Sequence, residues 1–175
     1  MNKIKLGSSV AVSDPCYDMP DLIIGNLLAG NYISFALEVK CGDWGDRIST
    51  LACVHESFAE KKLKWHECGA IGVDSGQAGI FDPKTYKNDE SVANKEAYDF
   101  GEKYHPQDEG DRWYRVCCNM TINDPGWGTY DKGVVSSSGI GDGCYDVYVA
   151  KHKGKIVGIY IDFGMLEDPD FHFYI

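Results

Sequence analysis

The chain has 175 residues, a mass of 19.4 kDa and a formal net charge of −10 at pH 7. This length is typical of one domain, so we expect residues 1–175 to form a single domain. No run of roughly 18 apolar residues occurs and no signal-like apolar block stands near the start, which predicts a cytoplasmic protein without a membrane partner. The acidic charge argues against nucleic acid as a partner of the molecule as a whole, because such binding relies on lysine and arginine replacing counterions.

The seven cysteines and five histidines show none of the spacings that hold metals. An odd number of cysteines without a CxxC pair predicts reduced thiols, and the absence of HxxxH or HxxxxH argues against zinc. No D-x-[DN]-x-[DN]-G loop for calcium is present. We therefore expect neither a metal nor a cofactor.

Taken in chain order, most apolar segments read as strands. In residues 31–39, Tyr/Ser/Ala/Glu alternate with Ile/Phe/Leu/Val, the period of two that is typical of a half-buried strand. Residues 145–150 and 156–163 flank the turn KHKGK and predict a hairpin. The other expected strands are residues 10–12, 47–55, 64–73, 112–122, 130–136 and an edge strand at 171–175.

One helix is predicted, over residues 89–104. Ala93, Ala97, Phe100 and Tyr104 fall on one stripe of a 3.6-residue helix, Asn88 or Asp89 can cap its start, and Pro106 ends it. Strands in runs with a single helix predict an α+β fold, mainly an antiparallel β-sheet arranged as a sandwich or meander.

The stretch VDSGQAGIFD, residues 73–82, is the first candidate site. Gly76 permits a turn after Asp74, and Asp74, Ser75 and Gln77 can act as polar groups at the rim of a pocket. The alternative is that Asp74 and Ser75 only bond to their own backbone, as such residues do in turns. Ser75 lacks the GxSxG spacing of a hydrolase elbow.

The glycine-rich loop SSSGIGDGCY, residues 136–145, is the second candidate. A dinucleotide or P-loop cradle needs a helix after the loop, whereas residues 145–149 alternate as a strand, so that type of site is excluded. The remaining hypotheses are an anion nest of backbone amides around Ser137 and Ser138, or an ordinary wide turn. The predicted ligand-binding residues of both loops are Asp74, Ser75, Gln77, Ser137, Ser138, Gly141, Asp142 and Tyr145.

Catalysis is the third possibility that these residues raise. Cys16, in Asp14-Pro15-Cys16-Tyr17, would need a cationic neighbour to become a nucleophile, and a buried structural thiol is the commoner case. Paired carboxylates for acid–base work could come from Asp14, Asp74, Asp142 and Asp162, but sequence alone does not show which of them meet. We predict no catalytic residue.

Three motifs occur together in this chain: SDPCY at residues 13–17, GVDSGQAGIFD at 72–82, and SSGIGDGCYDVYVA followed by IVGIYIDFG. In this combination the chain resembles a family of small bacterial and phage proteins classed only as a domain of unknown function. The late motif of that family, SGxGDGxYxVY followed by IDFG, matches residues 138–148 and 161–164. The resemblance implies no reaction, cofactor or catalytic set.

Three functions follow as expectations. The first is a non-catalytic protein that holds a small polar, nucleotide-like ligand between the two loops, by analogy with phage proteins that sequester a host immune signal. The second is an acidic inhibitor that binds a host protein, and the third is a hydrolase that uses Cys16 or clustered aspartates. The first requires that residues 74–82 and 137–145 meet in space.

Overall fold

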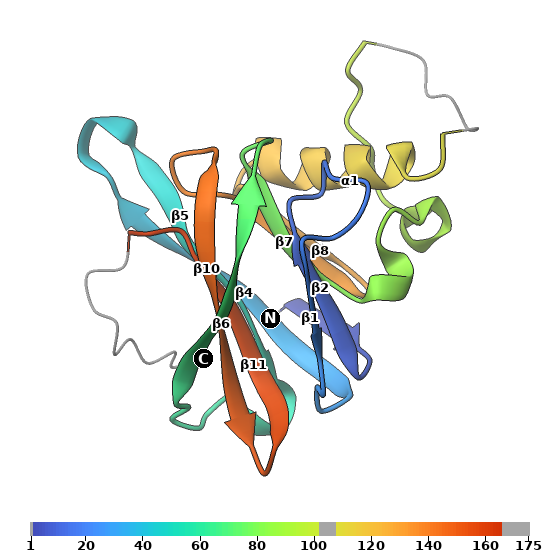
Figure 1. Cartoon of the computed structure of the whole chain (residues 1–175). Coiled ribbons are helices and arrows are strands. Elements are labelled where there is room, and N and C mark those ends of the chain that lie inside the picture. The colour runs from blue at the N-terminus through green and yellow to red at the C-terminus, as the bar shows by residue number, and fades with distance from the viewer. Residues whose placement is uncertain (1, 102–107, 166–175) are drawn as a thin grey trace.

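The computed structural model describes residues 2–101 and 108–165 (Figure 1). Within them, eleven strands form two antiparallel sheets. The six-stranded sheet has the order β1-β4-β5-β11-β10-β6, and the five-stranded sheet has the order β3-β2-β7-β9-β8. The strands are β1 (Asn2–Leu6), β2 (Ser9–Ser13), β3 (Leu22–Gly25), β4 (Gly30–Lys40), β5 (Asp46–His55), β6 (Trp65–Val73), β7 (Gln77–Phe81), β8 (Trp127–Tyr130), β9 (Gly133–Ser137), β10 (Gly143–His152) and β11 (Lys155–Asp162).

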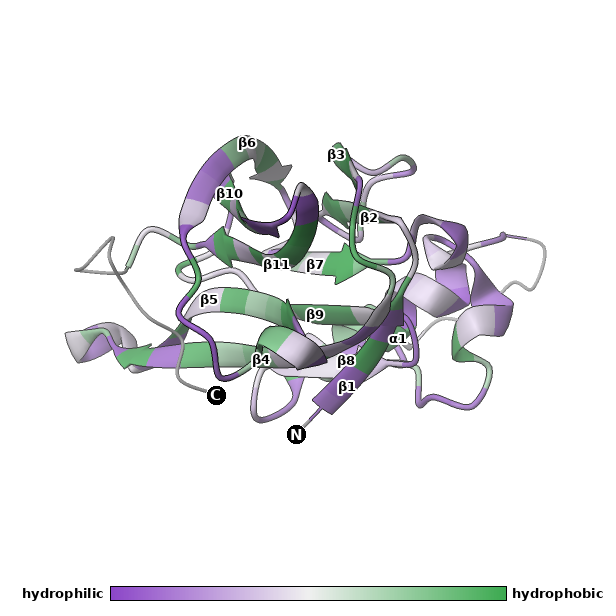
Figure 2. Ribbon diagram, turned by 90° about the horizontal axis from the view of Figure 1, so that it is seen from below, coloured by the Kyte–Doolittle hydropathy of each residue, from purple (hydrophilic) through white to green (hydrophobic). Residues whose placement is uncertain are grey.

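The sheets pack face to face, because alternate residues of their strands are apolar and turn inward. Leu51, Val147 and Ile159 of the six-stranded sheet share one core with Val12 and Ile80 of the five-stranded sheet. Figure 2 shows hydrophobic stretches in strands such as β5, β7 and β9. The prediction of a mainly antiparallel α+β fold is confirmed, in its sandwich form.

The helix α1 (Asp111–Ile122) covers the outer face of the five-stranded sheet. Trp113, Val116 and Cys117 of α1 are fully buried in a second core, where Trp113 contacts Phe81 of β7 with ring centroids 5.0 Å apart. The molecule therefore has three layers, with the five-stranded sheet in the middle. Among the described residues, no helix is long and apolar enough to cross a membrane.

The prediction of a strand at residues 112–122 is wrong, because this segment is the helix α1. Trp113, Val116, Cys117 and Met120 recur at the 3.6-residue spacing of a helix, and they all pack toward the sheet. Aromatic and β-branched residues around them suggested a strand, but the spacing of the buried side chains decides the structure.

The prediction of a helix over residues 89–104 is also wrong in its described part. Only a short 3-10 turn forms there, η4 (Asp89–Val92), and residues 93–101 are irregular. Their carbonyl groups bond to α1 instead of to one another, since the Arg112 guanidinium donates to the carbonyl oxygens of Ala93 and Lys95. Phe100, on the expected apolar stripe, is 47% exposed.

Other expected strands correspond to observed ones with small differences. The segment 130–136 is divided into β8 and β9 by a turn at residues 131–132, and β1, β3 and β7 were not predicted as strands. The edge strand expected at residues 171–175 lies outside the described residues.

Candidate functional site

The two predicted loops lie side by side at one end of the sandwich. The turn at residues 74–76 carries the chain from β6 in one sheet to β7 in the other, and the loop at residues 138–142 carries it back from β9 to β10. Because β7 pairs with β9 and β6 pairs with β10, the two crossings must occur at the same end. The Gly76 N–H donates to Asp142 Oδ1 at 3.0 Å, and the Ser138 N–H donates to the Gly76 carbonyl at 2.9 Å.

A buried carboxylate joins a third segment to these loops. Asp14 has no solvent exposure, and its two carboxylate oxygens accept four hydrogen bonds from neighbouring turns. The donors are the N–H groups of Cys16 (2.7 Å), Asp74 (2.8 Å) and Ser75 (2.7 Å) and the Ser75 hydroxyl (2.6 Å). These four bonds join the turn at residues 14–16 to the turn at residues 74–76, so Asp14 holds the two turns together.

The polar side chains of the DSGQ turn bond within the protein. The Tyr17 hydroxyl donates to Asp74 Oδ2 at 2.9 Å. Gln77 is buried, and its carbonyl oxygen accepts a hydrogen bond from the Thr121 hydroxyl at 2.9 Å. The turn thus connects the N-terminal segment, the strand β7 and the helix α1.

The glycine-rich loop also uses its polar groups internally. The N–H groups of Ser137 and Gly141 donate to the carbonyls of Gly126 and Ser138, and the Ser138 hydroxyl donates to the Gly141 carbonyl at 2.8 Å. The Tyr145 hydroxyl also donates to the Gly141 carbonyl, at 2.7 Å. Since the amides of Ser137, Ser138 and Gly141 are already bonded, an anion nest at these positions is not formed.

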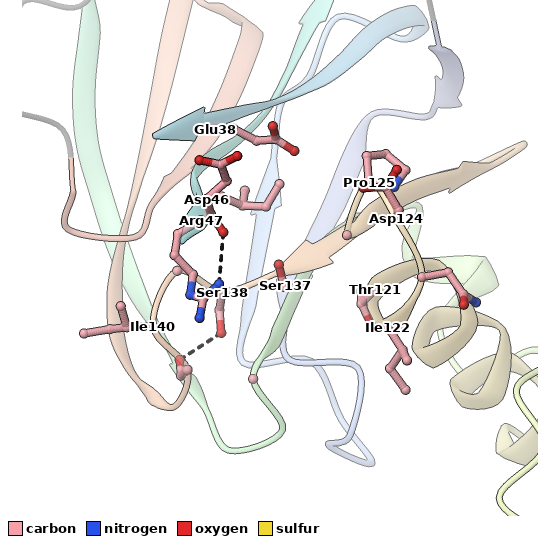
Figure 3. A pocket seen from close by; sticks show the side chains of 16 residues that line it. Glu38, Asp46, Arg47, Thr121, Ile122, Asp124, Pro125, Ser137, Ser138 and Ile140 are labelled. Atoms are coloured by element: carbon pink, nitrogen blue, oxygen red, sulfur yellow. Dashed lines mark hydrogen bonds between the residues drawn. The ribbon is translucent and has the colours of Figure 1, made fainter. Parts of the chain in front are cut away.

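A cleft of about 580 Å³ opens beside the glycine-rich loop (Figure 3). Its walls are residues 38 and 46–48, next to the turn of the β4–β5 hairpin, on one side and the end of α1 with the turn at residues 123–126 on the other. Of the predicted ligand-binding residues, Ser137, Ser138 and Gly141 line this cleft, together with Gly76 between Ser75 and Gln77. Asp74, Ser75, Gln77, Asp142 and Tyr145 are not among the residues that line it.

The charged lining of the cleft came from segments that the sequence did not indicate. Glu38, Asp46 and Asp124 contribute three exposed carboxylates, and the half-buried Arg47 contributes one guanidinium. The Arg47 guanidinium donates to the Asp46 carbonyl at 3.0 Å, which holds it close to the start of β5. The sequence Asn123-Asp124-Pro125-Gly126, which forms part of one wall, is typical of a turn. No sequence pattern indicates that this turn lies opposite the β4–β5 hairpin.

Three cysteine thiols, in the turn after Asp14 and in α1, have pKa values above the ordinary thiol value. Burial, and next the hydrogen bond to the Asp14 carboxylate, raise the pKa of Cys16 to about 12. Burial also raises the pKa of Cys117 and of Cys118 above the ordinary thiol value. Because the thiolate is the reactive form, these three cysteines are inert at neutral pH.

Of the four aspartates considered for acid–base work, three meet at this end of the sandwich. Asp14 bonds to the backbone of Asp74, and Asp142 bonds to Gly76 in the same turn. Asp162 lies on β11, directly opposite Asp146 of β10. None of the recorded hydrogen bonds among the described residues joins two of these carboxylates to each other.

These features define an α+β sandwich protein with an open, mainly acidic cleft where the chain crosses between its two sheets. The chain belongs to the family described as "Protein of unknown function (DUF4241)", whose model matches residues 36–161. No curated protein and no solved structure matches the chain. Asp14, which holds the DSGQ turn, lies outside the matched residues.

Proposed function

We propose that this protein binds a small polar ligand in the cleft between the β4–β5 hairpin and the end of α1, without covalent chemistry. The observation that carries the proposal is the cleft itself. It has the volume of a small-molecule site and collects polar groups from four segments far apart in the sequence. Rigid elements hold each wall, since β4 and β5 pair with each other and the end of α1 is bonded to Gln77.

The contacts inside the protein disfavour the hydrolase alternative. Ser75 donates its hydroxyl hydrogen to a carboxylate that already accepts three backbone N–H groups, and Cys16 has a raised pKa. The Ser75 hydroxyl and the Asp14 carboxylate are both used to hold the turn, and the raised pKa of Cys16 disfavours its nucleophilic thiolate form.

The charge of the lining bears on the chemical class of the ligand. Three carboxylates face one guanidinium, so the cleft favours a neutral or cationic polar molecule. A nucleotide-derived ligand would have Arg47 as its cationic partner in the cleft, and its phosphates would approach Glu38 and Asp46. One experiment can test both classes of ligand, because removing the charge of Glu38 should affect a cationic ligand and removing that of Arg47 should affect a nucleotide.

We expect that thermal unfolding in the presence of a ligand panel will reveal binding. At about a 100-fold excess over Kd, a bound ligand raises Tm by roughly 5–10 °C for a chain of this size. Glu38→Gln should abolish the shift for an amine or guanidine compound, whereas Arg47→Gln should abolish it for a nucleotide or cyclic nucleotide. Lys40→Gln, at an exposed position outside the cleft, should leave either shift unchanged. If no compound of either class raises Tm at millimolar concentration, the proposal is wrong.

A second candidate function, binding to a protein partner, is favoured by one observation. Trp44 is 67% exposed on the 3-10 turn η1 (Gly42–Trp44), at the tip of the β4–β5 hairpin and beside the carboxylates of Asp43 and Asp46. Exposed tryptophans often contribute 2 kcal/mol or more to a protein interface, by order of magnitude. The acidic neighbours predict a partner with basic side chains around an apolar pocket.

Affinity capture with the wild-type protein and with Trp44→Ala tests this candidate. We expect a captured protein whose retention falls as salt rises and is lost with Trp44→Ala. Met19→Ala removes an equally exposed side chain at another site and should retain the partner. Equal capture by the wild type and Trp44→Ala would contradict a role for the hairpin tip.

A further inference from the structure

The positive charge of this acidic protein is concentrated at one end of the six-stranded sheet. Residues 61–64 (KKLK) and 151–155 (KHKGK) contain six of the 17 basic residues and none of the 27 acidic ones. The rest of the chain therefore has 11 basic against 27 acidic residues, a net charge of −16. We call residues 61–64 and 151–155 the basic end.

The two segments form one continuous surface. Trp65, next to the first segment, is the strand partner of Ala150, next to the second. The Phe58 ring lies between them, with Lys61 Nζ 4.4 Å from its centroid on one side and the His152 ring 4.9 Å away. All six lysines are exposed.

In the described part of the chain, no ion pair neutralises the lysines of this surface. Within residues 2–101 and 108–165 two ion pairs form, Lys3 with Glu56 and Arg115 with Asp111, and neither includes a lysine of the basic end. Lys155 donates to the neutral side chain of Asn26 at 2.8 Å. Glu60 and Glu67 are the nearest acidic residues in sequence, and they leave an excess of positive charge.

A lysine in the turn of the β10–β11 hairpin has an unfavourable backbone conformation. Lys153 and Gly154 both have positive φ, 47° and 79°. Asn, Asp or Gly usually occupy the first of these positions, because a left-handed backbone is unfavourable for other residues. Asn26 donates to the Gly154 carbonyl at 2.7 Å and keeps the turn in place.

The acidic cleft lies at the opposite end of the same strands, since β10 runs from Gly143 beside the cleft to His152 at the basic end. Ten residues of strand span roughly 33 Å, whereas the Debye length at physiological salt is about 8 Å. An anion at the basic end is therefore screened from most of the negative charge. The net negative charge of the molecule therefore does not exclude nucleic acid from this surface.

The shape of the surface and its side chains favour one kind of polyanion. Residues 151–155, at the tip of the β10–β11 hairpin, extend beyond Ala150 and Gly158, the last residues paired with β6 and β5. The major groove of B-DNA admits a two-stranded ribbon of this kind. The large hydrophobic residues exposed in the described part of the chain, Met19, Ile23, Trp44, Phe100, Ile122 and Ile140, all lie elsewhere. The basic end thus lacks both the aromatic platform of single-strand binding and an apolar anchor for a lipid surface.

We propose that the basic end binds double-stranded DNA, with the tip of the β10–β11 hairpin in the major groove and lysines 61, 62 and 64 on the adjacent phosphates. This is a second function, separate from ligand binding in the cleft. Lysines on phosphates carry no sequence information, so we expect binding that depends little on sequence and strongly on salt.

Fluorescence anisotropy with a labelled 20-base-pair duplex tests the proposal. Two triple variants of the same net charge, −16, separate charge distribution from total charge. The first is Lys62→Glu, Lys64→Glu and Lys153→Glu at the basic end. The second is Lys5→Glu, Lys40→Glu and Lys84→Glu, at exposed positions elsewhere. We expect micromolar binding by the wild type at 50 mM salt, and a loss at least tenfold greater for the first variant than for the second.

A single variant separates binding from folding. Lys153→Asn removes one charge and places a residue that suits positive φ, so Tm should stay the same or rise. Its affinity for the duplex should fall severalfold, and the slope of log K against log salt should become shallower by about 0.9.

Four outcomes would overturn the proposal. They are absent binding, equal losses in the two triple variants, equal or tighter binding of the single strand, and binding to vesicles containing phosphatidylserine in place of the duplex.

Discussion

Asp14 shows how one carboxylate can determine the conformation of a whole region. It gathers three backbone N–H groups and one hydroxyl from two turns that are about 60 residues apart in the sequence. Each N–H group would otherwise lie in a partly buried turn without an acceptor, which costs about 1–3 kcal/mol per group. The aspartate that looked like half of an acid–base pair therefore acts as the anchor of the DSGQ turn.

Asp14→Asn should destabilise the protein by about 2–4 kcal/mol, because the new amide NH₂ would face N–H donors in place of an acceptor. The expected loss of Tm is roughly 5–15 °C, measured by thermal unfolding followed by circular dichroism. Asp18→Asn, the same change at an exposed position nearby, should leave Tm unaltered. A change of less than 1 °C in Asp14→Asn would show that Asp14 does not hold the turns.

At the scale of single elements, the β10–β11 ladder places two like charges opposite each other. Asp146 and Asp162 are strand partners. Thr50, whose buried hydroxyl has no hydrogen-bond partner among the described residues, pairs with Asp162 from the other side. Partial burial raises the pKa of Asp162 above its ordinary value, and the charge of Asp146 acts in the same direction. The ionised form of Asp162 is therefore less favourable in the folded state than in the unfolded chain.

The sign of this shift predicts a pH dependence of stability. A raised pKa means that the folded state loses stability as pH rises from the unfolded pKa, about 3.9, through the folded pKa, and the cost is complete above both. Asp162→Asn should raise Tm at pH 7, and the gain should disappear as pH falls toward 3. Asp99→Asn is a matched control, since Asp99 also accepts from the N–H two residues later but is exposed. A gain that is independent of pH, or a loss at pH 7, would contradict the assignment.

Sequence patterns identified most strands but misplaced the helix, and the reason lies in what surrounds each segment. Residues 31–39 form a strand as their alternation predicts, but Tyr32 and Ala36 meet the core between the sheets, whereas Phe35 packs against a smaller cluster that contains Val54 and Phe58. The apolar residues between 89 and 104 suggested a helix, yet the described part of that segment is tied to α1 through Arg112 and stays irregular. The irregular conformation of this segment depends on its contacts with α1. The sequence could not reveal these contacts, because residues 112–122 were predicted as a strand.

At the scale of the molecule, the sequence posed the question of whether the two loops meet, but it could not answer it. Their contact follows from the crossing of the chain between the sheets at β6–β7 and at β9–β10, a property of topology and not of either loop. The same holds for the cleft, where residues 38 and 46–48 of the β4–β5 hairpin and the turn at residues 123–126 lie on either side of Ser137. Patterns within a segment carry no information about such partners.

The position of β2 in the middle sheet has a consequence for how the chain folds as it leaves the ribosome. Ala11 of β2 pairs with Phe81 of β7, so the second partner of β2 is synthesised about 70 residues later. At ordinary rates of synthesis this interval is roughly 4–14 s. During that time β2 can pair with β3, which follows within 20 residues, while Val10 and Val12 still await the strand that completes their core. The N-terminal hairpin is thus made first and is anchored only after Ser75 emerges and reaches Asp14.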